Sequence, residues 1–151
     1  MKVVHHPILR LNAILHRRIH MYFDRQLKPY GLSFTHFRML VYLAHNEGTR
    51  QEDIRAFIDA DKGGVAHSIK RLVEKGYVAR ERDPQDKRAY TIRLTDEGRA
   101  FFEEFASVMQ EWTDQMVAGF SSEELKLAEG FLQRMADNAC ALLDDGCEAS
   151  S

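Results

Sequence analysis

The segment from Asp61 to Thr95 constrains the fold more than any other part of the chain. Its first half places apolar residues at helical spacing, which predicts an amphipathic helix with a buried side made of Val65, Ile69, Leu72 and Val73. Asp61 has the short carboxylate that is preferred at a helix N-cap, and Gly76 suits the left-handed position that follows a helix. We therefore predict a helix that begins after Asp61 and is closed at Gly76.

The second half of the segment has the period of β-strands. Tyr90, Ile92 and Leu94 alternate with polar residues, which indicates a strand with one packed face, and residues 78–82 are expected to pair with it. The sequence between the two strands, from Asp83 to Arg88, is too charged to pack, and Pro84 favours a type I turn after Asp83. The pattern predicts a β-hairpin whose charged tip stands out from the body.

A second short helix is expected just before this segment. Thr49 to Glu52 has the form of a capping box, and Ile54 with Phe57 would give the helix its buried side. Only residues 58–60 remain to connect it to the next helix. Two short helices joined by about three or four residues are typical of a helix-turn-helix unit, in which the first helix braces the second across a DNA groove.

Charge is distributed unevenly along the chain, although the net charge is only −2. Residues 62–95 contain nine Lys and Arg against four Asp and Glu, whereas residues 96–151 contain three against thirteen. The basic middle can meet phosphates, and the acidic C-terminal third would be repelled by them. A helix with exposed polar faces and a basic hairpin can contact both the base edges and the phosphates of a duplex. The pattern therefore indicates DNA binding.

Several motifs resemble those of the MarR family. Asp86-Lys87-Arg88, followed by Leu94-Thr95-Asp96-Glu97-Gly98, is similar to the D-x-R wing and the L-T-x-x-G junction of that family. Gly31-Leu32-Ser33, Asp61-Lys62-Gly63 and the run from Leu72 to Tyr77 extend the resemblance to most of residues 8–143. The resemblance implies a mainly α fold with a small β-hairpin wing. It also implies a homodimeric winged helix-turn-helix regulator that reads a pseudo-palindromic operator.

The resemblance also suggests roles for individual residues. Arg88 would enter the minor groove, and Asp86 would orient its guanidinium. Gly64 stands where the family commonly has Ser or Thr, so a hydroxyl contact is lost there. The predicted DNA-binding residues are Thr49, Arg50 and Gln51 at the start of the bracing helix, Lys62, Gly64, His67, Ser68, Lys70 and Arg71 on the recognition helix, and Arg82, Asp86, Lys87 and Arg88 on the wing.

The flanks predict association between two chains. We expect a single domain over residues 1–151, with a DNA-binding lobe at about 33–95, a helical dimerisation region at about 6–30 and 96–144, and a flexible tail at 145–151. Three long apolar stripes exceed what a small lobe can cover, which favours a twofold dimer over an intramolecular bundle. The stripes are Ile8, Leu11, Leu15, Ile19, Tyr22 and Gln26; Phe101, Phe105, Val108, Trp112 and Met116; and, after a capping box at residues 121–124, Leu125, Ala128, Phe131 or Leu132, Met135, Ala139 and Leu142.

Other kinds of site have weak support in the sequence. His16 and His20 lie four residues apart and could share a metal ion, but neither Cys nor Glu completes a ligand set nearby, so we expect no metal and no cofactor. Cys140 and Cys147 lie in an acidic surrounding that argues against a reactive thiolate. No catalytic motif is present, which predicts a protein that is not an enzyme. Without a signal peptide or spanning segment, we expect a cytoplasmic protein.

The leading hypothesis is a homodimeric repressor that a small ligand releases from its operator. The resemblance implies amphipathic aromatic effectors as a class, without assigning the residues of a pocket. Two alternatives stay open, a winged-helix protein-interaction module and a metal-responsive regulator that uses the histidines of the first helix.

Overall fold

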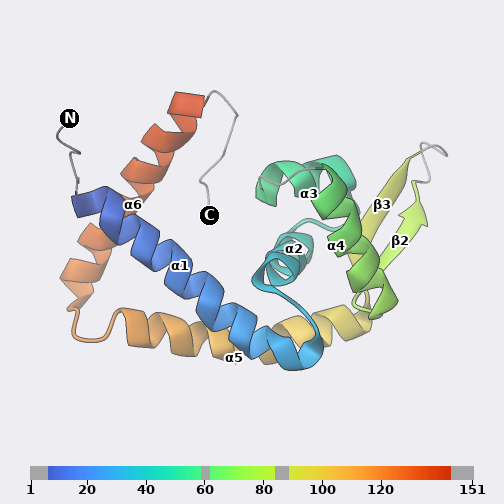
Figure 1. Cartoon of the computed structure of the whole chain (residues 1–151), viewed down its shortest axis with the longest axis horizontal. Coiled ribbons are helices and arrows are strands. Elements are labelled where there is room, and N and C mark those ends of the chain that lie inside the picture. The colour runs from blue at the N-terminus through green and yellow to red at the C-terminus, as the bar shows by residue number, and fades with distance from the viewer. Residues whose placement is uncertain (1–6, 59–61, 84–88, 144–151) are drawn as a thin grey trace. The chain divides into compact units, whose positions relative to one another are not determined.

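Short helices and the strands of a three-stranded antiparallel sheet lie between residues 34 and 94 of the computed structural model (Figure 1). The structure describes residues 7–58, 62–83 and 89–143. The chain forms two compact units, residues 1–104 and residues 105–151. The first unit contains the elements from α1 to β3 and the beginning of α5, and the second contains the rest of α5 and α6.

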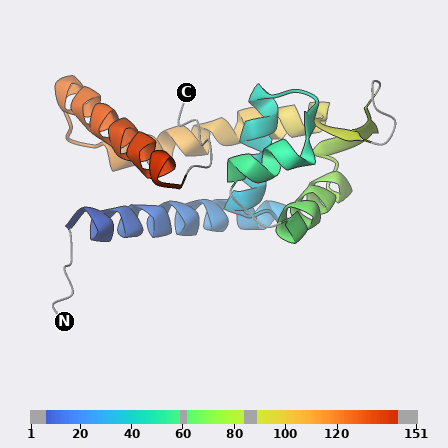
Figure 2. The same cartoon turned by 90° about the horizontal axis from the view of Figure 1, so that it is seen from above.

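The helix-turn-helix consists of α3 (Gln51–Ile58) and α4 (Lys62–Glu74), with α2 (Phe34–His45) packed against both. Figure 2 shows these helices from above. Residues 59–61 separate α3 from α4, one residue later than the predicted connection of 58–60, because Ile58 is still part of α3. Residues 59–61, with the predicted N-cap Asp61, lie outside the described part of the chain. The lobe has a core of fully buried side chains: Phe37, Leu40, Leu43, Ile54, Val65, Leu72 and Ile92.

The predicted end of α4 is confirmed. Gly76 has a φ of 78°, its N–H donates to the carbonyl oxygen of Val73 at 2.9 Å, and the N–H of Tyr77 donates to that of Leu72 at 3.0 Å. These two bonds form a Schellman motif, which satisfies carbonyl groups that a helix end leaves free. The buried side of α4 is narrower than predicted, because Val65, Ile69 and Leu72 are buried whereas Val73 is 40% exposed.

The sheet has the strand order β1–β3–β2, with β2 at Val78–Arg82 and β3 at Tyr90–Leu94. The predicted hairpin is confirmed, and Val78 pairs with Leu94 while Arg82 pairs with Tyr90. Ile92 and Leu94 are buried, but Tyr90 is exposed, because the hairpin extends past the core at that end. Of the predicted turn from Asp83 to Arg88, residues 84–88 lie outside the described residues.

The start of α3 differs from the prediction. Thr49 and Arg50 form a short strand, β1, in which Thr49 pairs with Ile92 of β3. The capping bond is shifted by one residue from the predicted box, since the N–H of Arg50 donates to Oδ2 of Asp53 at 3.1 Å. The buried residues of α3 are Ile54 and Ile58, whereas the predicted Phe57 is 45% exposed and lies against Tyr42.

Helix α1 (Pro7–Leu27) contributes to the core only near its C-terminal end. Phe23 and Leu27 are buried, and Phe23 stacks on Phe34 with ring centroids 4.9 Å apart. The residues of the predicted stripe nearer the N-terminus, Ile8, Leu11 and Leu15, are exposed. A short 3-10 helix, η1 (Lys28–Tyr30), and the left-handed Gly31 then turn the chain into α2.

Helix α5 (Asp96–Met116) begins at a hydrogen-bonded junction. The Thr95 hydroxyl donates to the carbonyl oxygen of Gly76 at 2.6 Å and accepts from the N–H of Gly98 at 3.0 Å. The N–H of Thr95 also donates to the carbonyl oxygen of Tyr77. One threonine therefore links the end of α4, the end of β3 and the start of α5.

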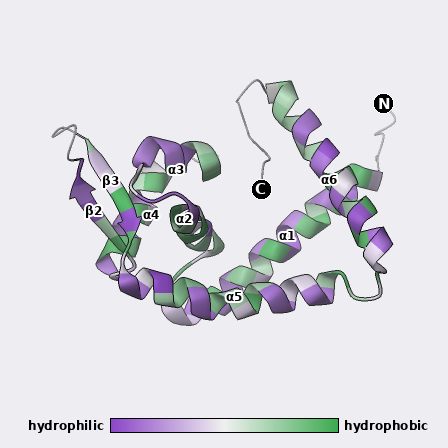
Figure 3. Ribbon diagram, turned by 180° about the vertical axis from the view of Figure 1, so that it is seen from behind, coloured by the Kyte–Doolittle hydropathy of each residue, from purple (hydrophilic) through white to green (hydrophobic). Residues whose placement is uncertain are grey.

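In the second unit, α6 (Ser122–Leu143) begins with the predicted capping box. The N–H of Ser121 donates to Oε2 of Glu124 at 2.8 Å, and the N–H of Glu124 donates to the Ser121 hydroxyl at 3.3 Å. Figure 3 shows that hydrophobic and hydrophilic residues alternate along α1 and along α6. No helix among the described residues has the length and apolar character needed to cross a membrane.

Candidate nucleic-acid interface

The surface of α4 that faces away from the core carries five of the predicted contact residues. His67, Lys70 and Arg71 are exposed, as is Gly64, and Ser68 is half-buried. Lys62 is the first residue of the helix. Lys70 lies 3.9 Å from Glu74, but exposed pairs at this spacing contribute only about 0.3–0.5 kcal/mol, so Lys70 can exchange this partner for a phosphate.

Arg71 and Lys75 direct their charged groups toward the turn at Gly31. A Cβ atom at Gly31 would lie 2.9 Å from Nζ of Lys75 and 3.3 Å from a guanidinium nitrogen of Arg71. Neither side chain forms a salt bridge within the described residues. The absence of a side chain at Gly31 leaves room for both cations. Positive charge is thus concentrated along one side of α4.

His36 lies close to this group of cations. The N–H of Ser33 donates to its Nδ1 at 3.0 Å, so His36 takes the place of the usual Glu in the capping box of α2. Burial and the positive charge of Arg71, followed by His67 and Lys75, lower its pKa, against a smaller opposite effect of Asp24. Within the described residues its Nε2 is buried without a hydrogen-bond partner. The lowered pKa and the bond from the Ser33 N–H both favour a neutral ring with Nδ1 as an acceptor.

The start of α3 places its three predicted residues differently. Thr49 is buried, Gln51 is half-buried and Arg50 is exposed. The Arg50 guanidinium forms an ion pair with Asp83, with 3.2 Å between Nη2 and Oδ2. Because the Thr49 side chain is buried in the sheet, a direct contact of its hydroxyl with DNA would need local rearrangement.

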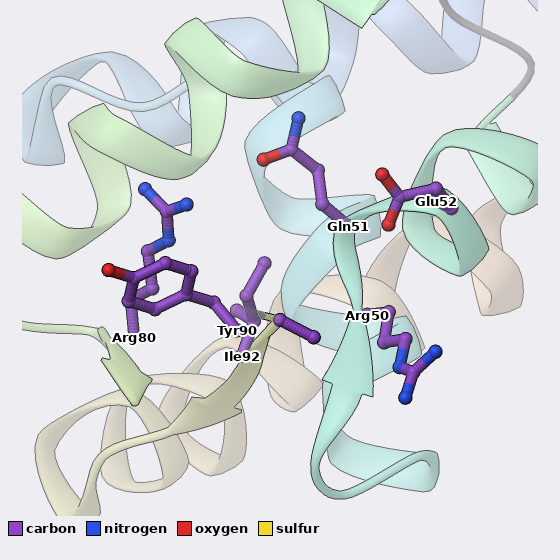
Figure 4. Close-up of a pocket in the computed structure, with 7 residues that line it drawn as sticks. Arg50, Gln51, Glu52, Arg80, Tyr90 and Ile92 are labelled. Carbon is purple, nitrogen blue, oxygen red and sulfur yellow. The ribbon is translucent and has the colours of Figure 1, made fainter. Parts of the chain in front are cut away.

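The wing carries an arginine–tyrosine stack. The Arg80 guanidinium carbon lies 4.1 Å from the centroid of the Tyr90 ring, and that of Arg82 lies 5.7 Å away. Figure 4 shows Arg80 beside the Tyr90 ring. The predicted contacts Asp86, Lys87 and Arg88 lie outside the described residues, but Arg80 and Arg82 extend along the strand that leads to them.

A shallow hollow of about 460 Å³ lies between the wing and the start of α3. It is lined by Arg50, Gln51, Glu52, Arg80, Ala89, Tyr90 and Ile92. Two of its arginines, Arg50 and Arg80, come from the two parts that the sequence predicts to contact DNA. Polar and apolar side chains contribute about equally to this lining.

Other candidate sites lack a complete set of groups. The rings of His16 and His20 have centroids 4.5 Å apart, but no group of three His, Cys, Asp or Glu side chains suited to a metal ion occurs among the described residues. The Cys140 side chain is half-buried, and Cys147 lies outside the described residues.

The sequence prediction missed Arg80, Lys75 and His36. Arg80 lies two residues before Arg82 and therefore on the same strand face, and Lys75 lies four residues after Arg71 on the same helix side. These two spacings were available in the sequence. Ser33 and His36 have the spacing of a capping box, but the surrounding cations come from α4, which only the fold brings close.

Comparison with known proteins gives consistent results. The model of the MarR family matches residues 30–89. The HTH-type transcriptional regulator BilQ of Clostridium symbiosum (strain WAL-14163) is 30% identical over 110 residues, which cover 73% of this chain and 76% of that protein. The uncharacterized HTH-type transcriptional regulator YdgJ of Bacillus subtilis (strain 168) is 33% identical over 108 residues, covering 72% and 66%. A MarR transcriptional regulator from Methanosarcina mazei Go1 superposes with a TM-score of 0.82 and 28% identity, covering 89% of this chain and 97% of that one.

Proposed function

Because this chain belongs to the MarR family of winged-helix, DNA-binding transcriptional regulators, we propose that it is a homodimeric repressor of a pseudo-palindromic operator. A small ligand, for which the family resemblance favours an amphipathic aromatic compound, would release it from that operator. The role is one of binding, without catalysis. The observation that carries the proposal is the pairing of an exposed cationic helix face on α4 with an arginine-bearing hairpin.

The two parts would grip different features of a duplex. The α4 face would lie in the major groove, where Arg71 and Lys70 can reach bases or phosphates and His67 and Ser68 can make shorter polar contacts. Lys62 and the start of the helix, where Gly64 has no side chain, would meet phosphate. On the wing, Arg82, Lys87 and Arg88 would bind along the minor groove, with Asp86 orienting Arg88.

Dimerisation would place two such lobes on one operator. Exposed apolar side chains along α1 and α6, which include Leu11, Leu15 and Phe131, support a dimer built from these helices. Recognition helices about 34 Å apart would match half-sites separated by one helical turn. A ligand that binds the arrangement with misplaced helices more tightly would shift the population away from DNA.

Selection from a randomised duplex library tests this function. We expect the purified protein to recover an inverted repeat with half-site centres about 10 bp apart. The affinity for the selected duplex should fall steeply with salt, because each neutralised phosphate adds about 0.9 to the slope of log K against log [salt]. Weak and equal binding to all sequences would contradict the proposal and favour a protein-interaction module.

The Arg71→Ala variant assigns the recognition helix. If Arg71 reads a guanine, the variant should lose about 1–3 kcal/mol of binding free energy and relax one operator position; if it holds a phosphate, binding should weaken alike on all sequences. Arg134→Ala is the matched control, since it removes the same charge from the acidic C-terminal third and should leave binding unchanged. Unchanged binding by Arg71→Ala would contradict the placement of α4 in the groove.

A further inference from the structure

An ion pair joins the two sides of the winged helix across the sheet. Arg50 is the last residue of β1, and its guanidinium lies 3.2 Å from Asp83, the residue that follows β2. Because the strand order is β1–β3–β2, a contact between these residues spans β3. The N–H of Asp83 donates to the carbonyl oxygen of Ala89 at 3.0 Å, so Asp83 stands where the hairpin ends and the tip begins.

The register places this ion pair on one defined face of the sheet. Arg50 pairs with Thr91, and Thr91 pairs with Glu81, so these side chains share a face. Arg80 and Tyr90 alternate with them and belong to the opposite face. Figure 4 shows the Arg50 guanidinium directed away from Arg80 and Tyr90. The cation of Arg50 is thus turned away from the arginine–tyrosine stack.

The carboxylate of this pair is much more shielded from water than its partner. The Asp83 side chain is 12% exposed and that of Arg50 is 54% exposed. On the same face, Arg93 and Glu81 form a pair in which both side chains are about half exposed. A shielded carboxylate has lost most of its hydration and depends more on its cation than an exposed one does. Loss of Arg50 should therefore disturb Asp83 more than loss of Arg93 disturbs Glu81.

We propose that Arg50 is a positioning residue that ties the tip end of the wing hairpin, at Asp83, to the start of α3, and that it does not serve as a phosphate ligand. The backbone of Arg50 is fixed as well, because its N–H donates to Asp53 of α3. One residue then sets the position of the wing relative to the helix-turn-helix. This inference rests on the proposed function, since a fixed separation matters when helix and wing must fit two grooves of one duplex.

A double-mutant cycle on operator binding tests the tie. Arg50→Ala and Asp83→Ala should each weaken binding about two- to fivefold, and the double variant should be no weaker than either single one. The exchanged pair, Arg50→Asp with Asp83→Arg, should recover part of the loss. The salt slope should stay that of the wild type. The matched control cycle, Arg93→Ala and Glu81→Ala, should show little coupling.

Effects of opposite sign on operator binding, from Arg50→Ala and from Asp83→Ala, would identify Arg50 as a phosphate ligand. If Arg50 held a phosphate, Arg50→Ala would lower the salt slope by about 0.9, and Asp83→Ala would tighten binding by freeing the guanidinium and removing a negative charge. Additive losses in the cycle would likewise overturn the proposal.

A measurement without DNA separates this inference from the proposed function. Hydrogen exchange at the Asp83 amide should be faster in Arg50→Ala than in the wild type, and unchanged in Arg93→Ala. Unchanged exchange in Arg50→Ala would refute the tie even if the operator is bound normally. Faster exchange in a protein that binds no duplex would support the tie and refute the function proposed for it.

Discussion

Gly98 has no space for a side chain. A Cβ atom there would lie 2.0 Å from the carbonyl oxygen of Tyr77, a backbone atom that cannot rotate away. We expect Gly98→Ala to lower the free energy of unfolding by at least about 2 kcal/mol, because helix and hairpin must separate to admit the methyl group. Urea denaturation measures the loss. Gly130→Ala is the control, since its Cβ would meet nothing within 4 Å and should be neutral or slightly stabilising.

His36 links the stability of the fold to pH. Burial is the main cause of its lowered pKa, and the charges of Arg71, His67 and Lys75 add to it, while Asp24 acts in the opposite direction. Between this lowered value and the ordinary value of 6.5, the unfolded chain binds a proton that the folded chain does not. The free energy of unfolding that the neutral ring contributes is therefore fully present above pH 6.5, and it is lost as the pH falls through that window.

Replacing His36 by Gln should reduce this pH dependence. Gln can also accept a bond at the third position of a capping box, but it does not titrate. The unfolding free energy of His36→Gln, measured at several pH values between 7.5 and 5, should fall less on acidification than that of the wild type. A part of the slope should remain, because burial also lowers the pKa of His20. Parallel curves for the two proteins would contradict the assignment.

At the scale of elements, the junction at Thr95 holds α4, β3 and α5 together. Thr95→Val keeps the shape but removes the hydroxyl that donates to Gly76 and accepts from Gly98. Two half-buried backbone groups lose their partner, so we expect a loss of about 1–3 kcal/mol in unfolding free energy. Thr113→Val is the matched control, because that hydroxyl bonds only within its exposed helix and should cost less than about 0.5 kcal/mol. Equal effects of the two changes would refute a role for the junction.

The order and type of the elements between residues 49 and 94 follow from the sequence, apart from one short strand. The end of α4 and the pairing of β2 with β3 are local patterns, and both are confirmed. Val73, Phe57 and Tyr90 were predicted to be buried and are exposed, because helical or strand period gives the direction of a side chain but not how far the core extends. Which apolar residues are covered depends on the neighbouring elements.

Contacts between segments distant in the chain were not predictable from periodicity. Strand β1 has two residues, too few for an alternating pattern, and exists because β3 provides an edge at Ile92. The Arg50–Asp83 pair depends on that strand. The sequence therefore predicted that Arg50 binds DNA but did not reveal its partner, Asp83. Among the predicted site residues of the wing and α4, Gly64, His67, Lys70, Arg71 and Arg82 are exposed and Ser68 is half-buried, as their spacing suggested.

At the scale of the whole molecule, the balance of charge differs between the two units. The basic residues 62–95 belong to the first unit, and the second unit lies wholly within the acidic C-terminal third. Phosphates would attract the first and repel the second. Apolar side chains exposed on α6 offer a surface that a second chain can cover.

The dimer prediction can be tested by placing a charge on α6. We expect the wild type to sediment with twice the chain mass of 17.5 kDa, and Phe131→Glu to sediment as a monomer, because a carboxylate would be buried without a partner in the dimer. Its affinity for the selected inverted repeat should fall at least about tenfold with the loss of one lobe. Lys126→Gln changes the net charge equally, on the opposite side of α6, and should remain a dimer. A dimeric Phe131→Glu would place the interface elsewhere.

The composition of the sheet edges has a consequence for how the protein behaves at high concentration. An unpaired strand edge invites strands of other molecules to add to it, which is a common start of aggregation. Here one outer strand, β1, has only two residues, and the other, β2, ends with Arg80, Glu81 and Arg82. Short length and dense charge both discourage such addition. The hairpin can therefore extend from the lobe and still remain unavailable to the hairpins of neighbouring molecules.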